Sequence, residues 1–350
     1  MRVAIEAAAL TLTSGGLARY TTELSLALAR CHPEDEYFLV SDQPFHMPDG
    51  APPNLRRGGG PRNAIERRWW LWGLRREMDR LGAKLIHGPD FSVPYLGGRP
   101  SVLTLHDLSP WMDERWHRDA TRVKRRTPVL LELGVATMVV TPGEAVRKQA
   151  MERFRLRPDR VVAVPEAAAP WFRPVEVAPE HPYFLFVGTM EPRKNLPALI
   201  EAWREVQREH PVDLVLIGRR RRDSPPIAEE PGLRIVGEVP DEELPRWYSG
   251  ALAMVYPSLY EGFGLPVLEA MQCGACVIAS HAVSEAAGDA ALYADDTKGL
   301  AQAMRLAASR PDVVGDHRAR SLRRAAEFTW ERAARMTRAV YEEALQRFGN

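Results

Sequence analysis

Residues 183–195 read Tyr-Phe-Leu-Phe-Val-Gly-Thr-Met-Glu-Pro-Arg-Lys-Asn, and this stretch decides the fold. Its first five residues are an uninterrupted apolar run, which predicts a strand buried on both faces. The run restarts a pattern that begins at Val3–Ile5, where a short strand is followed by the turn Ser14-Gly15-Gly16 and an amphipathic helix. Because strands and helices alternate in two separate series, the sequence predicts two parallel sheets with crossover helices.

Short apolar segments predict the other strands of both sheets. In the first half, the expected strands are Val3–Ile5, Tyr37–Val40, Lys84–His87, Ser101–Leu105 and Met138–Val140. In the second half, they are Tyr183–Val187, Leu214–Ile217, Leu233–Val236, Met254–Tyr256 and Cys276–Ala279.

The prolines between residues 165 and 182 predict a linker between the two sheets. We expect an N-terminal domain over residues 1–172 and a C-terminal domain over residues 173–334. A helix is expected over about residues 330–347, with Thr329 as its N-cap. Its last part, residues 335–350, is expected to cross back onto the first domain.

The composition is typical of a globular protein, with 350 residues, 45% hydrophobic and 27% charged. The net charge is only +1, yet residues 1–173 carry 26 basic and 20 acidic side chains, and residues 174–350 carry 21 and 26. This asymmetry predicts that the first half meets an anionic partner or surface. A nucleic-acid partner is disfavoured, because the overall charge is near zero and no recognised motif is present.

The three cysteines are too few for a disulfide framework. Cys273 and Cys276 form a C-x-x-C pair without metal-spaced partners, so we interpret them as packing residues. The start Met-Arg-Val-Ala-Ile-Glu predicts a strand rather than a signal peptide. No uncharged apolar run reaches the roughly 18–20 residues that span a bilayer. We therefore expect a cytoplasmic protein, free or bound peripherally at the inner face of the membrane.

Two loops carry groups that suit an anion. Gly15 and Gly16 let backbone N–H groups approach an anion at a helix N-terminus, although glycine pairs also make ordinary turns. Arg193 and Lys194 precede a helix that Asn195 can cap, and adjacent cations there suit a diphosphate. The alternative for this second loop is a solvated surface loop.

Residues 260–270, Tyr-Glu-Gly-Phe-Gly-Leu-Pro-Val-Leu-Glu-Ala, place two carboxylates around a glycine-rich loop. Pro266 predicts the helix start and puts Glu269 in the first turn. Glu261 and Glu269 can offer acceptor oxygens to a sugar and a ribose, although such pairs also serve as capping or surface devices. His106 ends a predicted strand, where ligands gather in open sheets, and its alternative is a satisfied core histidine. The remaining histidines lack metal-binding spacing, so no metal site is expected.

Four segments together resemble the group 1 (family 4) retaining glycosyltransferases of GT-B fold. They are Gly-Gly-Leu-Ala-Arg-Tyr at 15–20, His-Asp-Leu-Ser-Pro at 106–110, the stretch at 188–195, and Tyr-Pro-Ser-Leu-Tyr-Glu-Gly-Phe-Gly-Leu-Pro-Val-Leu-Glu-Ala-Met at 256–271. The resemblance covers essentially the whole chain in order. It is greatest to bacterial enzymes that use GDP-mannose or related sugar nucleotides to build surface polysaccharides and lipid-linked glycans.

The resemblance implies an α/β protein of two facing Rossmann-like domains with parallel sheets and a cleft between them. It implies a nucleotide-sugar donor, a glycan or lipid-linked acceptor, GDP or UDP as product, and neither a cofactor nor a metal. Retention in the family is usually explained by front-face attack, in which the leaving phosphate oxygen takes the proton of the acceptor. Positioning and electrostatics then supply most of the catalysis.

The resemblance also assigns catalytic roles to four side chains. Arg193 and Lys194 would hold the phosphates and stabilise the charge that develops on the leaving nucleotide. Glu261 would face the donor sugar, and His106 would hydrogen-bond that sugar near the reacting carbon. The other residues that would contact the donor are Gly15 and Gly16 at the diphosphate, Val239 at the base, the backbone of Phe263, Gly264 and Leu265 near the sugar, and Glu269 at the ribose.

The chain departs from the family pattern in two loops. The loop Ser280-His-Ala-Val-Ser-Glu285 is about two residues shorter than in relatives and lacks their proline. The resemblance therefore does not decide which sugar is transferred. Residues 219–222 are four arginines, which we interpret as a solvated loop rather than as nucleotide ligands.

A third feature is the segment 62–84, in which three tryptophans stand among arginines: Trp69, Trp70 and Trp72, with Arg67, Arg68, Arg75, Arg76 and Arg80. With the second basic cluster at residues 118–126, it could rest on an anionic membrane. Alternatively, Ile65, Trp69, Trp72 and Met78 could pack inward as a core helix. Two other functions also stay open: a GT-B-fold sugar-nucleotide epimerase or phosphorylase, and a non-catalytic subunit of a glycan assembly complex.

Overall fold

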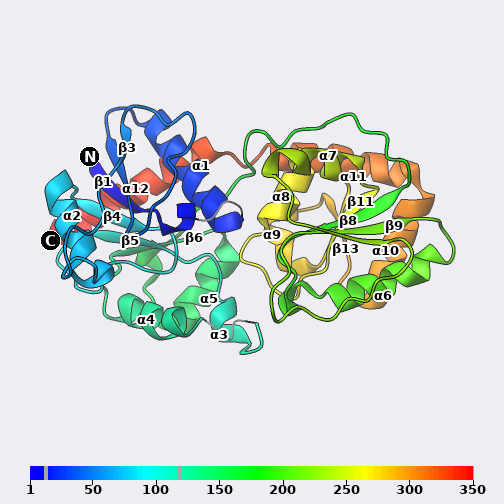
Figure 1. Cartoon of the computed structure of the whole chain (residues 1–350), viewed down its shortest axis with the longest axis horizontal. Helices are drawn as coiled ribbons and strands as arrows, with labels where there is room; N and C mark the ends of the chain where they lie inside the picture. The colour runs from blue at the N-terminus through cyan, green and yellow to red at the C-terminus, as the bar shows by residue number, and fades with distance from the viewer. Residues whose placement is uncertain (12–14, 117–119, 350) are drawn as a thin grey trace. The chain divides into compact units, whose positions relative to one another are not determined.

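The computed structural model describes residues 1–11, 15–116 and 120–349, which form two compact units (Figure 1). Unit 1 comprises Met1–Met112, His117–Glu166 and Thr329–Asn350, and unit 2 comprises Asp113–Trp116 and Ala167–Phe328. The predicted linker, residues 165–182, contains neither helix nor strand, and the chain passes from unit 1 to unit 2 within it. Ser14 of the predicted glycine turn and Arg118 of the second basic cluster lie outside the described residues.

Unit 1 is built on a parallel sheet with the strand order β3-β2-β1-β4-β5-β6-β7. Its strands are β1 (Arg2–Glu6), β2 (Glu36–Val40), β3 (Leu55–Arg57), β4 (Leu85–Gly88), β5 (Ser101–Thr104), β6 (Met138–Thr141) and β7 (Val161–Ala163). In the central strand β1, Val3 pairs with Tyr37 of β2 and with Leu85 of β4. Because all the strands of this sheet are parallel, their carboxyl ends lie at one edge. Gly15 follows β1 in the chain and His106 follows β5.

The helices of unit 1 come from both ends of the chain. They are η1 (Ala8–Thr11), α1 (Gly16–Cys31), the π-helical turn η2 (Trp69–Gly73), α2 (Leu74–Leu81), α3 (Ser109–Met112), α4 (Thr121–Glu132), α5 (Glu144–Phe154), η3 (Pro158–Arg160) and α12 (Trp330–Gly349). Helix α12 packs against α1. The Thr329 hydroxyl accepts a hydrogen bond from the Arg332 N–H at 3.1 Å, which confirms the predicted N-cap.

Unit 2 contains a second parallel sheet, with the order β10-β9-β8-β11-β12-β13. Its strands are β8 (Tyr183–Val187), β9 (Asp213–Ile217), β10 (Leu233–Gly237), β11 (Ala253–Tyr256), β12 (Val277–Ala279) and β13 (Ala291–Tyr293). Its helices are η4 (Pro192–Lys194), α6 (Leu196–Gln207), η5 (Asp241–Glu243), α7 (Leu244–Gly250), α8 (Leu265–Gln272), η6 (His281–Val283), α9 (Ser284–Ala287), α10 (Thr297–Ser309) and α11 (Pro311–Ala325). Every residue of β8 is buried, as its apolar run predicts.

All the strands predicted from apolar runs are present, but β3, β7 and β13 were missed. Each of these three is three residues long and lies at the edge of its sheet. A strand of that length carries no measurable periodicity, and an edge strand needs fewer apolar residues because one side has no neighbouring strand.

In the tryptophan-rich segment, some of the apolar side chains pack in the core and others are exposed. Trp69 and Met78 are 2% and 1% exposed and pack in the core beside β1 and β2. Ile65 and Trp72 are 55% and 43% exposed, so the inward-packing alternative does not hold for these two residues. The reason is that a π-helical turn, not a continuous α-helix, joins residue 69 to α2, and it rotates Trp72 out of the apolar face.

The two cysteines of the C-x-x-C pair are 2% and 0% exposed and belong to the unit 2 core, which confirms the packing interpretation. Burial raises the pKa of each thiol to about 12. Among the described residues, no helix is both long and apolar enough to cross a bilayer.

Candidate active site

In unit 2, the loops that follow β8 and β11 are joined by buried ion pairs. Arg193 and Lys194 lie in η4, just after β8, and Glu261 lies in the loop after β11. Lys194 Nζ is 2.5 Å from Glu261 Oε1, and Arg193 Nη1 is 2.9 Å from Glu261 Oε2. None of the three side chains is more than 9% exposed. The structure thus brings together three of the four predicted catalytic residues.

Burial and charge act in opposite directions on this cluster. Burial alone would raise the pKa of Glu261, but Arg193 and Lys194 outweigh it and lower that pKa to about 2. Burial lowers the pKa of Lys194, although Glu261 favours its charged form. Lys194 also donates to the Tyr256 hydroxyl and lies 4.6 Å from the centre of that ring. The ammonium group is therefore fixed in a site with little water, where it acts strongly on a nearby anion.

A second carboxylate extends the cluster. Glu191 is 5% exposed, and its two oxygens accept from Arg193 Nη2 at 2.8 Å and from Arg221 Nη1 at 2.5 Å. Arg221 also pairs with Asp223 at 2.9 Å. The interpretation of residues 219–222 as a solvated loop is therefore wrong for Arg221, although its three neighbours are exposed. The physical reason is that the buried Glu191 has a second oxygen that needs a donor.

The charges of this cluster balance. Arg193, Lys194 and Arg221 face Glu191, Glu261 and Asp223, so cations and carboxylates are equal in number. Glu261 holds the two cations that the resemblance assigns to phosphate, so a diphosphate bound by both of them would compete with this carboxylate.

The helix that follows η4 begins differently from the prediction. Asn195 adopts a left-handed conformation with φ 54°, and its side chain makes no capping hydrogen bond, so the predicted cap is wrong. The residue serves instead to turn the chain between η4 and α6, a conformation that asparagine tolerates better than most residues.

Gly264 is required where the second loop enters α8. Its φ is +103°, and a Cβ at this position would lie 2.8 Å from Val283 Cγ1. Phe263 is buried against Phe328, with ring centres 5.6 Å apart, and Leu265 is the first residue of α8. Val283, in the loop at residues 280–285, thus lies against the glycine that shapes this part of the site.

Glu269 and Val239 lie further from the ion pairs. Glu269 is in the second turn of α8, not in the first as predicted, because the helix begins at Leu265. Its side chain is 1% exposed, and Oε2 accepts from the Tyr248 hydroxyl at 3.1 Å. Val239 follows β10 and packs partly buried against the core. The ribose and base roles of these two residues stay predictions.

Glycines lie at the ends of three neighbouring strands, and no role was predicted for them from the sequence. Gly188, Gly218 and Gly237 follow or end β8, β9 and β10. The Gly218 N–H donates to the Gly237 carbonyl at 2.7 Å. A Cβ at Gly218 would lie 2.1 Å from the Gly188 carbonyl oxygen, so no other residue fits there. The backbone segments at this edge therefore pack closely on one another.

In unit 1, His106 uses both ring nitrogens within the unit. Nε2 donates to the Pro89 carbonyl oxygen at 2.7 Å, and Nδ1 lies 3.1 Å from Glu166 Oε1. Burial would lower the pKa of His106, but Glu166 and the Pro89 carbonyl outweigh it and raise that pKa. A ring that donates on both sides is an imidazolium. Contact between His106 and the donor sugar stays a prediction and requires one of these bonds to be exchanged.

A buried hydrogen-bonded chain lies beneath His106. His87 of β4 bonds to the Tyr341 hydroxyl at 2.7 Å and to the Thr104 hydroxyl at 2.8 Å, and Thr104 bonds to Tyr20 at 3.0 Å. Burial lowers the pKa of His87 to about 3, so this ring is neutral. The Tyr20 ring contacts His106 edge-on at 4.6 Å. The network therefore holds the Tyr20 ring in place against His106.

Gly15 stands just before α1 and is exposed, with nothing within 4 Å of where a Cβ would lie. Gly16 is the first residue of α1 and is also exposed. Their backbone at the N-terminus of a helix is thus open to a ligand, and their contact with a diphosphate stays a prediction.

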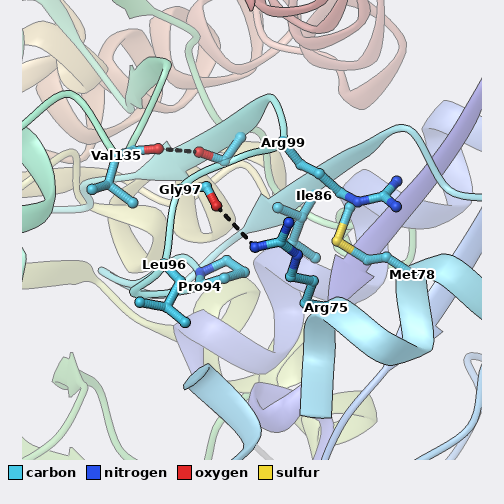
Figure 2. Close-up of a pocket in the computed structure, with 9 residues that line it drawn as sticks. Arg75, Met78, Ile86, Pro94, Leu96, Gly97, Arg99 and Val135 are labelled. Atoms are coloured by element: carbon cyan, nitrogen blue, oxygen red, sulfur yellow. Dashed lines mark hydrogen bonds between the residues drawn. The ribbon is translucent and has the colours of Figure 1, made fainter. Parts of the chain in front are cut away.

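The pocket of Figure 2 lies elsewhere in unit 1. Arg75, Met78, Ile86 and Arg99 line it (Figure 2). Ser101, the first residue of β5, is also among its lining residues. Because His106 follows the other end of β5, this pocket is at the opposite edge of the sheet. Among the described residues, no group of His, Cys, Asp and Glu side chains could hold a metal ion.

Comparison with known proteins supplies two family matches. Residues 181–310 match the family model described as "Glycosyl transferases group 1", and residues 14–170 match "Glycosyltransferase Family 4". The chain is 33% identical over 298 residues to the O-antigen chain mannosyltransferase B of Escherichia coli, covering 77% of this chain and 76% of that protein. It is 25% identical over 268 residues to the O-antigen chain mannosyltransferase RfbU of Salmonella typhimurium, covering 70% and 72%.

Solved structures share the fold at low sequence identity. A sucrose-phosphate synthase from Thermosynechococcus elongatus has a TM-score of 0.73 at 20% identity, covering 98% of both chains. WaaG, a glycosyltransferase involved in lipopolysaccharide biosynthesis, has a TM-score of 0.70 at 14% identity, covering 96% of this chain and 98% of its own. Anabaena HepE in complex with UDP and glucose has a TM-score of 0.71 at 13% identity, covering 97% and 99%. These likenesses confirm the α/β GT-B fold predicted from the sequence.

Proposed function

The chain belongs to the group 1, family 4 glycosyltransferases, and on that premise we propose that it transfers mannose from GDP-mannose to a glycan or lipid-linked acceptor with retention of configuration. The observation that carries the proposal is the buried cluster of Arg193, Lys194 and Glu261, in which two cations and one carboxylate meet at the carboxyl edge of the unit 2 sheet.

The choice of mannose is supported by the curated relatives. O-antigen chain mannosyltransferase B is 33% identical to this chain, and RfbU is 25% identical. The structures that contain UDP or UDP-glucose are at most 14% identical and bear on the fold alone. We therefore favour GDP-mannose over UDP-glucose, with surface polysaccharide or glycolipid biosynthesis as the setting.

Donor binding would proceed by exchange within the charged cluster. The diphosphate takes the donors of Arg193 and Lys194 that Glu261 holds in the free protein. Glu261 is then released toward the hydroxyl groups of the sugar, which donate to its ionised oxygens. In the free protein the two cations hold the pKa of Glu261 at about 2, so the group is ionised when the donor arrives.

Catalysis would then depend on the charge that develops on the leaving phosphate. The two fixed cations stabilise that charge without reorganisation, since burial already holds them in place. The leaving oxygen accepts the proton of the acceptor hydroxyl as the new bond forms on the same face of the sugar. Contact of His106 with the donor sugar, by exchange of one of its two hydrogen bonds within unit 1, belongs to the same proposal.

Peripheral membrane contact belongs to the same proposal. Trp72 is 43% exposed, and Arg67 and Arg68 beside it are exposed as well. Tryptophan and arginine side chains suit the interface of an anionic bilayer. Flotation with vesicles should show a preference for anionic over neutral lipid, and equal recovery with both would remove the membrane contact from the proposal.

A transfer assay tests the function. Purified protein is incubated with GDP-mannose, UDP-glucose or UDP-GlcNAc and a mannosylated acceptor, and release of the nucleotide is measured with and without acceptor. We expect acceptor-dependent release of GDP from GDP-mannose that the Glu261→Ala variant loses. Release that needs no acceptor would favour another enzyme class, and wild-type turnover in the variant would refute the site.

A further inference from the structure

Two arginines of α4 converge on one neutral oxygen in unit 1. Arg122 and Arg126 lie one helical turn apart, and both donate to the Tyr95 hydroxyl. The Arg122 bonds measure 2.9 Å from Nη2 and 3.2 Å from Nε. Within the described part of the chain, no carboxylate forms an ion pair with either arginine. Among the residues that the structure describes, two like charges are therefore held close together without a paired carboxylate.

Arg122 lowers the pKa of one buried acid, Glu6, but Glu6 does not neutralise the charge of Arg122. Glu6 ends β1 and is 2% exposed, and Arg122 has a small lowering effect on its pKa. Burial has the larger effect and raises that pKa to about 8, so Glu6 is mostly uncharged at pH 7. Over residues 120–349 and the other described ranges, the two guanidinium groups thus have no ion-pair partner and can accept an external anion.

The rings of Trp70 and Tyr95 lie under the guanidinium groups of the two arginines. Trp70 stacks on Tyr95 with ring centres 6.1 Å apart, and the Tyr95 N–H donates to the Trp70 carbonyl at 2.9 Å. The Arg122 guanidinium lies 5.8 Å from the Trp70 ring, and that of Arg126 lies 4.6 Å from the Tyr95 ring. Such contacts orient the guanidinium groups and leave their charge intact.

The loop that carries Tyr95 also carries the partner of His106. Pro89 accepts the His106 Nε2 bond, and Phe91 accepts from Thr127 of α4 at 2.8 Å through its carbonyl oxygen. Phe91 has a φ of 53°, an uncommon conformation for an aromatic residue. Residues 89–95 thus run from the carboxyl edge of the sheet to the paired arginines.

We infer that Arg122 and Arg126, with Tyr95 and Trp70, form a binding site for a phosphate or diphosphate group of the acceptor. Phosphate oxygens replace the Tyr95 hydroxyl as acceptors for two guanidinium forks, the geometry that arginine provides for phosphate. The Trp70 and Tyr95 rings contact the part of the acceptor next to the phosphate. The inference rests on the proposed function only in naming the acceptor as the molecule that bears the phosphate.

Titration calorimetry on the full chain tests the site with farnesyl diphosphate and inorganic pyrophosphate as probes. The variant Arg122→Gln/Arg126→Gln is compared with Lys124→Gln/Arg125→Gln, which removes the same charge from the same helix outside the site. We expect the first variant to bind farnesyl diphosphate at least roughly tenfold more weakly than the wild type, and the second to bind within about twofold of it. GDP-mannose binding, measured in parallel, should be equal in all three proteins.

A third variant and a membrane arm separate the alternatives. Tyr95→Phe keeps the ring stack and removes the oxygen that phosphate would displace, so it should bind farnesyl diphosphate at least as tightly as the wild type. Equal weakening in both double variants would overturn the site in favour of general attraction. Loss of binding to phosphatidylglycerol vesicles in the Arg122→Gln/Arg126→Gln variant, without any binding of the soluble diphosphates, would assign the arginines to a bilayer and also overturn it. Loss of the GDP-mannose signal alone would count against the proposed function and not against this site.

Discussion

Replacing Glu261 with glutamine should destabilise unit 2 and weaken transfer for separate reasons. The pKa of Glu261 falls from an ordinary value of 4.5 to about 2 in the folded protein. Each tenfold change in proton affinity corresponds to about 1.4 kcal/mol, so the ionised group contributes about 3 kcal/mol of stability at pH 7. This agrees with the roughly 3–5 kcal/mol that is lost when one partner of a buried ion pair is removed.

The pH dependence has a definite sign. A carboxyl group whose pKa is lowered by folding stabilises the protein above its unfolded value and loses that effect as the pH falls toward its folded value. The difference between wild type and Glu261→Gln should be constant from pH 7 to about pH 5, and it should shrink to about half by pH 3. Thermal unfolding followed by circular dichroism should show a lower transition by about 6–12 °C at pH 7.

A surface pair supplies the control. Glu209 pairs with Arg305 at 2.7 Å in the same unit, but its side chain is 50% exposed. Glu209→Gln should change stability by less than about 1 kcal/mol, because exposed ion pairs contribute little. GDP should raise the transition temperature of Glu261→Gln more than that of the wild type, since the phosphates no longer compete with the carboxylate. Equal stability of wild type and Glu261→Gln at pH 7 would refute the reasoning.

Three further predictions concern other parts of the molecule. Glu166→Gln should lower the pKa of His106, which NMR of the imidazole protons can follow; the stability that wild type gains over this variant should be full below about pH 6.5 and fall as the pH rises through the folded pKa of His106. Gly218→Ala should destabilise unit 2 by more than about 3 kcal/mol in urea unfolding, because of the overlap with Gly188, whereas Gly315→Ala, in an exposed part of α11, should be neutral or stabilising by up to about 1 kcal/mol. The two cysteines of the C-x-x-C pair should not react with a thiol reagent in the native protein, and rapid modification of either would contradict their burial.

The strands were predictable because a parallel sheet covered on both faces requires apolar residues at every position. Tyr183–Val187 is buried throughout, and a run of five apolar residues followed by glycine carries that information locally. The loops after β8 and β11 were predictable for a different reason, since their cations, carboxylates and glycines are chemically distinctive. The resemblance carried by these loops assigned Arg193, Lys194 and Glu261 to one site.

What the sequence could not supply were partners made by three-dimensional contact. Arg221 stands in a run of four arginines, and only the buried second oxygen of Glu191 distinguishes it from its neighbours. Asparagine is a common N-cap residue, but Asn195 has a left-handed backbone conformation. This conformation follows from the 3₁₀ turn that precedes it. Arg122 and Trp70 are about fifty residues apart and meet only because Tyr95 lies between them.

Helix α12 gives the molecule an order of folding. It is made after both sheets, yet Tyr341 completes the buried chain through His87, and Arg338 pairs with Asp35 at 2.7 Å. Unit 2 consists almost entirely of residues 167–328 and has its whole core before α12 leaves the ribosome. The unit that begins first during synthesis is therefore finished second, and until then the face of α1 that α12 covers is open to chaperones and to proteases.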